Sequence, residues 1–193
     1  IFHSVSAFCN AGLSSFSSGD YLEYFNVTYF SSVIMLLIVI GGIGFPFIAN
    51  TIDYLEHRLI KRKGRKYGAF SVSSKLVGIT SLVLLLSGTV IFYFLESHLL
   101  FKDLSTAKGL FHSLFASVTS RTAGFSTIDI GSLNHSTLII MMILMWIGAS
   151  PASCGGGIKT LNIALAMLNI KSAINGRHHI RVFKRQIGLE SVN

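Results

Sequence analysis

Two short strips carry the residues with the most specific chemistry, NAGLS at residues 10–14 and TAGFS at residues 122–126. Each follows an apolar run with helical spacing. Each also contains a glycine, which can take a positive φ and turn the neighbouring carbonyl groups toward a common axis. Rings of carbonyl oxygens can replace the hydration shell of a permeating cation. We therefore predict an ion-binding filter formed by the backbone of Asn10, Ala11, Gly12, Leu13, Thr122, Ala123, Gly124 and Phe125.

The ion predicted for these strips is a weakly hydrated monovalent cation. Neither strip contains a carboxylate, so selectivity would depend on backbone oxygens. The alternative is that each strip is an ordinary helix C-cap, with a glycine just past the helix end. The strip occurs twice, each time before a long apolar stretch, and this repetition favours the filter.

A short helix must hold each strip in place. Residues 104–118 predict one, because Ser105 is a candidate cap and apolar residues recur at helical spacing from Ala107 to Val118. A short apolar helix followed by a glycine-containing strip is typical of a re-entrant segment. The start of the chain resembles the tail of a second such segment. Arg121 immediately precedes the second strip, and we expect it to hydrogen-bond the carbonyl groups behind the filter.

The composition indicates that these elements lie in a membrane. Of the 193 residues, 51% are hydrophobic and 12% are charged, whereas soluble domains usually carry about 25% charged residues. A helix needs about 20 apolar residues to cross the bilayer. Stretches of at least this length predict three membrane spans, at residues 27–51, 71–96 and 134–174.

The placement of positive charge predicts the topology. Lys and Arg gather at residues 57–66 and again after the last span, whereas residues 1–26 contain neither. Basic residues near span ends mark the cytoplasmic side. We therefore place residues 52–70 in the cytoplasm and residues 98–133 on the outer side. The formal net charge of +8 is explained by topology and lipid headgroups, and no nucleic-acid partner is expected.

The last apolar stretch is interrupted at residues 148–157, GASPASCGGG. Proline removes a backbone donor, and each glycine costs a helix about 1 kcal/mol relative to alanine, so this segment should be unwound. Unwound backbone at membrane depth must line water or protein. We interpret it as a flexible gate below the filter, with a packing kink as the alternative. The predicted gate residues are Ser153, Cys154, Gly155, Gly156, Gly157 and Lys159.

Two smaller features have alternative interpretations. The GGIGFP run at residues 41–46 is favoured as a packing kink, where small residues let neighbouring helices approach closely, over a second flexible barrier. Lys159 either holds a functional charge inside the membrane or extends its ammonium group to the cytoplasmic interface.

Together these elements predict an all-α polytopic membrane protein built from repeated helix–pore-loop–helix units with a broken inner helix. The first residue is Ile1, inside a helical run, so we expect a fragment. The predicted parts are the end of one pore repeat (1–51), a basic cytoplasmic linker (52–70), a second pore repeat (71–175) and a cytoplasmic connection (176–193).

Nothing in the sequence predicts catalysis. It contains no phosphate-binding loop, metal-ligand cluster or nucleophile arrangement, and its acidic residues lie outside the centres of the predicted spans. A proton or sodium pump usually needs an intramembrane carboxylate. We therefore expect a transporter and not an enzyme. The rival interpretations are the membrane subunit of a sodium-translocating ATPase complex and a non-conducting scaffold.

Four motifs together carry a family resemblance: FHSVSAFCNAGLS, SVTSRTAGFSTID, GGIGFP and ASPASCGGGIKT. They resemble the Trk/Ktr/HKT superfamily of cation transporters, most closely the bacterial Ktr membrane subunit. The resemblance implies four repeats in a complete chain, of which the first and fourth filter strips are missing here. It also implies potassium uptake across the plasma (inner) membrane by a multi-pass protein, with K+ as the permeating ion, Na+ as a second candidate and no organic cofactor. The implied partners are a second copy in a homodimer, a cytosolic ring of nucleotide-binding regulatory subunits and the lipid bilayer, and the glycine loop is the implied gate.

Overall fold

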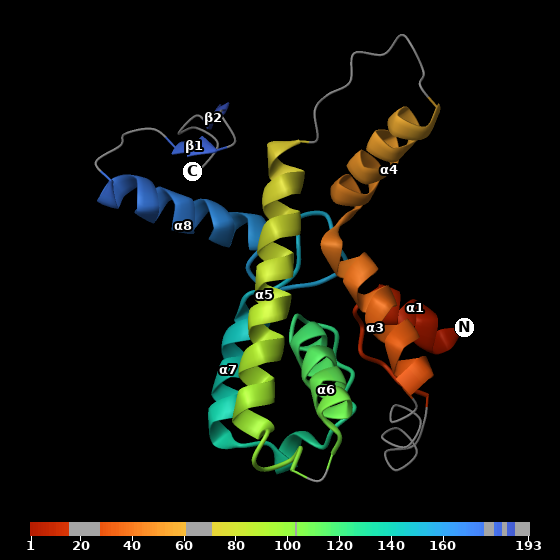
Figure 1. Cartoon of the computed structure of the whole chain (residues 1–193). Coiled ribbons are helices and arrows are strands. Elements are labelled where there is room, and N and C mark those ends of the chain that lie inside the picture. The colour runs from red at the N-terminus through yellow and green to blue at the C-terminus, as the bar shows by residue number, and fades with distance from the viewer. Residues whose placement is uncertain (16–27, 61–70, 103, 176–179, 183–184, 188–193) are drawn as a thin grey trace.

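The computed structural model describes residues 1–15, 28–60, 71–102, 104–175, 180–182 and 185–187. The described chain is helical except for one short antiparallel hairpin (Figure 1). Residues 61–70 of the predicted linker and most of the predicted cytoplasmic connection lie outside the described residues. The elements are α1 Phe2–Phe8, α3 Thr28–Ile43, α4 Phe45–Ile60, α5 Val72–Glu96, α6 Thr106–Thr119, the 3-10 helix η1 Ile130–Ser132, α7 His135–Trp146, α8 Thr160–Ile174, β1 Ile180–Val182 and β2 Arg185–Ile187.

Helix α5 is the continuous membrane span that the sequence predicted at residues 71–96. Its 25 residues are apolar enough to cross a bilayer, and at about 1.5 Å per residue they exceed its ~30 Å hydrocarbon core. The helix begins at Ser71, whose side chain accepts a hydrogen bond from the Ser74 N–H. No other single helix in the described part of the chain is both long and apolar enough to span.

The span predicted at residues 27–51 is not continuous. Helices α3 and α4 meet at Gly44, which has a φ of +90°, and the chain bends there by 96°. Helix α4 then runs to Ile60, so residues 52–60 are helical where a cytoplasmic loop was expected. The predicted packing kink is confirmed at Gly41, where a Cβ atom would lie 1.9 Å from the Phe8 carbonyl oxygen. The absence of a side chain at Gly41 therefore lets the end of α1 lie directly against α3.

Helix α6 has the re-entrant geometry predicted for the pore helix. It starts near the end of the molecule where α5 finishes, runs back beside α5, and the chain returns to the same end at η1 (Figure 1). Ser105 occupies the N-cap position, although its side chain makes no cap hydrogen bond. The hydroxyl of Ser117 donates to the Leu85 carbonyl oxygen at 2.9 Å and ties α6 to α5.

The last apolar stretch is broken, as predicted, but its two halves do not follow one line. Helix α7 ends at Trp146, α8 begins at Thr160, and α8 leaves crosswise to α5 and α7 (Figure 1). The carboxylate of Glu96 anchors the start of α7. It is 1% exposed and accepts hydrogen bonds from the Asn134 N–H at 3.0 Å and the Thr137 hydroxyl at 2.5 Å. A carboxylate at this position also complements the positive end of the α7 dipole.

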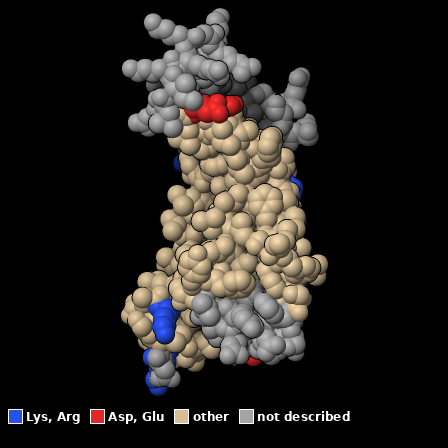
Figure 2. Space-filling view, turned by 90° about the vertical axis from the view of Figure 1, so that its right-hand side faces the viewer, with Lys and Arg blue, Asp and Glu red and all other residues tan. Residues whose placement is uncertain are grey.

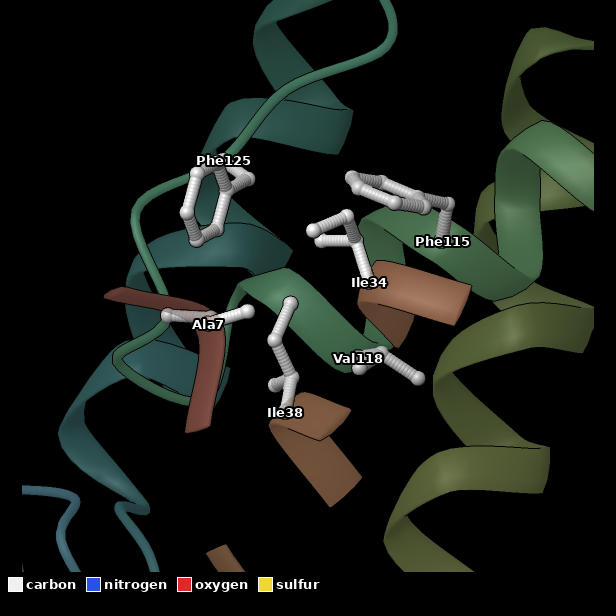
Figure 3. Close-up of a cluster of buried hydrophobic side chains, with 7 residues drawn as sticks. Ala7, Ile34, Ile38, Phe115, Val118 and Phe125 are labelled. Carbon is white, nitrogen blue, oxygen red and sulfur yellow. The ribbon is translucent and has the colours of Figure 1, made fainter. Parts of the chain in front are cut away.

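A compact apolar core joins the two repeats behind the predicted strips. In Figure 3, side chains from α1, α3 and α6 converge with the side chain of Phe125 from the second strip. All of these side chains are at most 3% exposed. The core residues are Ala7, Ile34, Ile38, Phe115, Val118, Ala123 and Phe125.

The surface charge is distributed as expected for a chain that crosses a membrane. Figure 2 shows a broad band without Lys, Arg, Asp or Glu, and the charged residues visible on this face lie toward its two ends. The end of α4, the start of α5 and the β1–β2 hairpin lie at the same end of the molecule (Figure 1). The residues on either side of the predicted basic linker therefore share one side with the chain that follows the last span, as the charge pattern predicted.

Replacing Gly41 by alanine should lower the thermal unfolding midpoint of the full-length protein in detergent. The new Cβ atom would lie 1.9 Å from a backbone oxygen of α1, so the two helices must separate. Overpacking of this kind costs about 1–3 kcal/mol. Gly42→Ala is the matched control, because the nearest atom to its Cβ would be Asn10 Nδ2 at 3.6 Å. Equal midpoints for the two variants would contradict the close approach of α1 and α3.

Candidate functional site

The two predicted filter strips have the same backbone conformation. In the first strip φ is +51° at Asn10 and +66° at Gly12, and in the second it is +72° at Thr122 and +82° at Gly124. The alanine between each pair is not among the residues with positive φ. Thr122 is β-branched, and a positive φ is a strained conformation for such a residue. Both strips therefore have a positive φ at their first and third residues but not at the alanine between them, a pattern that an ordinary helix end does not require.

The strips also lie against each other. A Cβ atom on Gly12 would lie 2.7 Å from the Ala123 carbonyl oxygen and 2.8 Å from the Gly124 Cα. A Cβ atom on Gly124 would in turn lie 3.0 Å from the Gly12 Cα. Side chains are excluded on both sides of this contact, so the structure brings the backbones of two segments far apart in sequence directly together.

A hydroxyl group in each of the helices α1 and α6 is hydrogen-bonded to the strip that follows that helix. The Ser6 hydroxyl donates to the Leu13 carbonyl oxygen at 2.8 Å and accepts from the Leu13 N–H at 2.9 Å. The Thr119 hydroxyl donates to the Phe125 carbonyl oxygen. Ser6 lies six residues before Gly12 and Thr119 five residues before Gly124, so the two correspond when one gap is placed between the helix and the strip. The sequence analysis missed this pair, although the recurrence of a hydroxyl residue at that position was a usable signal.

These hydroxyl contacts correct the predicted filter at one residue in each strip. The carbonyl groups of Leu13 and Phe125 are turned back toward their own pore helices. The Phe125 side chain is part of the apolar core, whereas the Leu13 side chain is 61% exposed. Among the described residues, no donor reaches the carbonyl oxygens of the other six predicted positions, which are Asn10, Ala11, Gly12, Thr122, Ala123 and Gly124.

The predicted gate lies directly beside the inner end of both strips. The Gly156 N–H donates to the Thr122 hydroxyl at 3.2 Å. A Cβ atom on Gly155 would lie 2.8 Å from Thr122 Oγ1 and 3.5 Å from Asn10 Nδ2. Both polar atoms of the Asn10 amide are buried without a hydrogen-bond partner in the described part of the chain. The loop therefore touches the strips through their first residues.

The loop is folded back on itself by its own hydrogen bonds. The Ala149 N–H donates to the Gly156 carbonyl oxygen at 3.0 Å, and the Gly148 N–H donates to the Ile158 carbonyl oxygen at 3.1 Å. A Cβ atom on Gly148 would lie 1.8 Å from the Gly156 carbonyl oxygen, so this fold requires glycine. Ser153 Oγ donates to the Ser150 carbonyl oxygen at 2.6 Å. The thiol-bearing residue Cys154 is exposed.

The charge of Lys159 is held by the loop. Its Nζ donates to the Gly155 carbonyl oxygen at 2.8 Å, four residues back along the chain. The sequence left two alternatives for Lys159, a charge held beside the loop inside the membrane and an ammonium group that extends to the cytoplasmic interface. The contact with Gly155 does not match the second alternative. A cation is thereby fixed next to the glycines, beside the first turn of α8.

The expectation for Arg121 was wrong. Within the described residues its side chain makes no hydrogen bond to the carbonyl groups behind the strip, and its Nε is buried without a partner. The side chain instead lines a cavity of about 290 Å³ between α3, α5 and the end of α6. The sequence placed Arg121 next to the strip correctly but did not determine the direction of its side chain.

The fold and the site together define a class. A helix that enters and leaves at one end, a glycine strip with carbonyl groups free of protein donors, and a broken inner helix are the parts of a pore-loop membrane transport protein. The chain belongs to the TrkH family of cation transport proteins, whose family model matches residues 1–193. Members of this family are multi-pass plasma-membrane proteins, and the chain accordingly belongs to a membrane protein.

The chain is similar to several named potassium uptake proteins. It is 39% identical over 187 residues to Ktr system potassium uptake protein D of Bacillus subtilis, covering 96% of the chain. It is 34% identical to Ktr system potassium uptake protein B of Vibrio alginolyticus, covering 100%, and 32% identical to the potassium/sodium uptake protein NtpJ of Enterococcus hirae, covering 97%. The chain spans only 40%, 41% and 39% of the length of these three relatives.

A solved structure has the same fold. The chain superposes on the crystal structure of the potassium transporter TrkH from Vibrio parahaemolyticus with a TM-score of 0.70, at 18% sequence identity. The match covers 98% of this chain and 39% of the other. At this identity the similarity establishes the helical arrangement, which agrees with the predicted repeated helix–pore-loop–helix units.

Replacing Thr119 by valine should loosen the second strip. Valine keeps the shape of threonine but leaves the Phe125 carbonyl group without its donor, and an unpaired buried acceptor costs about 1–3 kcal/mol. We expect a lower unfolding midpoint and faster amide exchange at residues 122–126. Thr119→Ser keeps the hydroxyl group and should behave like the parent protein. If the valine and serine variants exchange at the same rate, the hydroxyl group does not hold the strip.

Proposed function

We propose that this chain supplies two filter strips and the gate of a potassium-uptake protein of the plasma membrane. The observation that carries the proposal is the matched geometry of the two strips. Each has positive φ at the same two positions, each leaves three carbonyl groups without a donor from the described residues, and the two glycines face each other. Oxygen atoms arranged in this way can take the place of water around a cation.

The proposed permeating ion is K+. The six free carbonyl groups belong to residues without acidic side chains, which suits a monovalent ion that loses its hydration shell easily. Two relatives are named as potassium uptake proteins, and one as a potassium/sodium uptake protein. Na+ is accordingly the second ion that we assign. The proposal involves no organic cofactor and no catalytic step.

The energy for uptake would come from the membrane potential. An inside-negative potential supplies about 2.3 kcal/mol per charge for each 100 mV, which is enough to concentrate a monovalent cation without ATP hydrolysis. Rubidium uptake into vesicles that contain the full-length protein tests this directly. Uptake driven by the potential alone supports the proposal. Uptake that requires ATP hydrolysis would indicate a sodium-translocating ATPase subunit, and no uptake would indicate a scaffold.

The proposed gate is the loop that joins α7 and α8. It lies against the inner end of both strips and carries the ammonium group of Lys159, so an ion leaving the filter must pass it. The gate residues are those predicted from the sequence: Ser153, Cys154, Gly155, Gly156, Gly157 and Lys159.

The proposed assembly contains further copies and further proteins. We assign a homodimer of pore-forming chains resting on a cytosolic ring of nucleotide-binding regulatory subunits, as the family resemblance implies. The basic segments before α5 and after α8 are the proposed docking surfaces, because both adjoin the same end of the molecule (Figure 1). The apolar band between the charged ends would contact lipid (Figure 2).

Replacing Gly124 by serine should weaken the discrimination between K+ and Na+. Gly124 has a φ of +82°, and its Cβ atom would lie 3.0 Å from the Gly12 Cα. A residue with a Cβ pays about 1–2 kcal/mol in this conformation, so the backbone of the strip would be displaced. We therefore expect the ratio of K+ to Na+ uptake to fall. Gly131→Ala is the control, and an unchanged ratio in Gly124→Ser would argue against the filter.

Deleting residues 152–156 should raise the flux of rubidium without changing the K+ to Na+ ratio. The deletion removes most of the proposed barrier and leaves the carbonyl groups of both strips in place. Gly156→Ala is the matched control, since nothing lies within 4 Å of its added Cβ atom. Loss of flux in a correctly assembled deletion variant would indicate a packing role for the loop.

A further inference from the structure

The proposed gate loop is bonded to the break between α3 and α4, which belongs to the other repeat. Residues more than 100 positions apart in the printed sequence meet here through backbone groups. Three hydrogen bonds join them: Ser150 N–H to the Gly42 carbonyl oxygen at 3.1 Å, Cys154 N–H to the Gly41 carbonyl oxygen at 3.2 Å, and Phe45 N–H to the Ala152 carbonyl oxygen at 3.1 Å.

These bonds involve backbone groups that a helix cannot pair by itself. The last carbonyl groups of α3 and the first N–H groups of α4 have no partners within their own helices. In an apolar surrounding each such group is costly unless another donor or acceptor reaches it. The loop provides two donors for the end of α3 and one acceptor for the start of α4. Each interruption of an inner helix thus satisfies groups left open by the other.

Gly44 is the residue that permits this contact. Its φ of +90° is in the left-handed region that favours glycine, and a Cβ atom there would lie 2.5 Å from the Pro151 carbonyl oxygen. The neighbouring Gly42 has no such restriction, because its Cβ would meet only Asn10 Nδ2, at 3.6 Å. One glycine of the GGIGFP run therefore governs how closely the loop approaches the break.

We propose that the α3–α4 break is the seat of the gate loop, and that Gly44 and the Phe45 N–H are positioning groups that hold the loop across the exit of the filter. The inference depends on the proposed gate for its functional consequence, but the seat itself is defined by the contacts of residues 150–154. Loosening the seat lets the loop move away from the strips. Flux then rises while the carbonyl groups that select the ion stay unchanged.

Two matched pairs of variants in the full-length protein test the seat. Gly44→Ala brings a Cβ atom against the Pro151 carbonyl group, and Gly42→Ala is its control. Phe45→Pro removes the N–H that donates to Ala152, at a first helical position where proline is tolerated. Phe45→Ala keeps that N–H and controls for the lost side chain. The second pair keeps the inference testable if Gly44→Ala does not assemble.

Amide hydrogen exchange at residues 150–154, followed by mass spectrometry, measures the seat directly. The N–H groups of Ser150 and Cys154 are themselves donors in it. We expect exchange about fivefold faster in Gly44→Ala and Phe45→Pro than in their controls, the factor that corresponds to about 1 kcal/mol, the usual net value of one hydrogen bond. Rubidium flux should rise by a similar factor, with an unchanged K+ to Na+ ratio.

The outcomes separate the seat from the gate. Exchange at the control rate in both test variants would overturn the seat, whatever the flux. Faster exchange with unchanged flux, together with unchanged flux on deleting residues 152–156, would support the seat and contradict the gate. A third outcome is that the deletion raises flux, whereas Gly44→Ala and Phe45→Pro exchange faster but keep the control flux. The break would then hold the loop without positioning the gate, and the inference would be overturned.

Discussion

A backbone carbonyl group in an apolar surrounding needs a hydrogen-bond donor, a water molecule or a cation, and this requirement organises the described chain. Within α3, α5 and α7 the carbonyl groups accept hydrogen bonds from N–H groups of the same helix. At the interruptions other groups do so: the hydroxyls of Ser6 and Thr119 hold the residue after each filter glycine, and the loop after α7 pairs with the break at Gly44. The carbonyl groups from Asn10 to Gly12 and from Thr122 to Gly124 receive no donor from the described residues, and these are the groups to which the proposed ion would bind.

The strips can hold this conformation because they are supported from two directions. Positive φ at a β-branched residue such as Thr122 costs about 1–3 kcal/mol and persists only where the surroundings enforce it. On one side, Ala123 and Phe125 are embedded in the apolar core shared by α1, α3 and α6 (Figure 3). On the other side, the loop donates a hydrogen bond to the Thr122 side chain. The apolar core holds the backbone of the strip, whereas the loop contacts only the hydroxyl group of Thr122.

The two inner helices are interrupted in different ways, and the difference has a physical reason. Between α3 and α4 a single glycine turns the chain by 96°, whereas α7 and α8 are separated by a long loop that folds on itself. A sharp bend leaves helix-end groups open in one place, and a folded loop has spare backbone donors and acceptors to satisfy them. The two interruptions lie together, and backbone N–H and carbonyl groups of each form hydrogen bonds with groups of the other.

The sequence alone determined the elements whose signals are local. The apolar run of residues 71–96, the helical spacing before TAGFS, and the Pro and Gly residues of the loop were enough to predict α5, α6 and the broken inner helix. The repetition of the strip predicted the two glycines with positive φ, Gly12 and Gly124. The tertiary structure decided what depends on contacts between distant segments. Leu13 and Phe125 turn their carbonyl groups back because hydroxyl groups in the pore helices reach them, and Arg121 enters a cavity instead of supporting the strip. The chain bends by 96° at Gly44, and a loop more than 100 residues away pairs with the open groups of this bend. Spacing along a chain encodes helices and their ends, but the donor that satisfies a given carbonyl group is known only when the chain has folded around it.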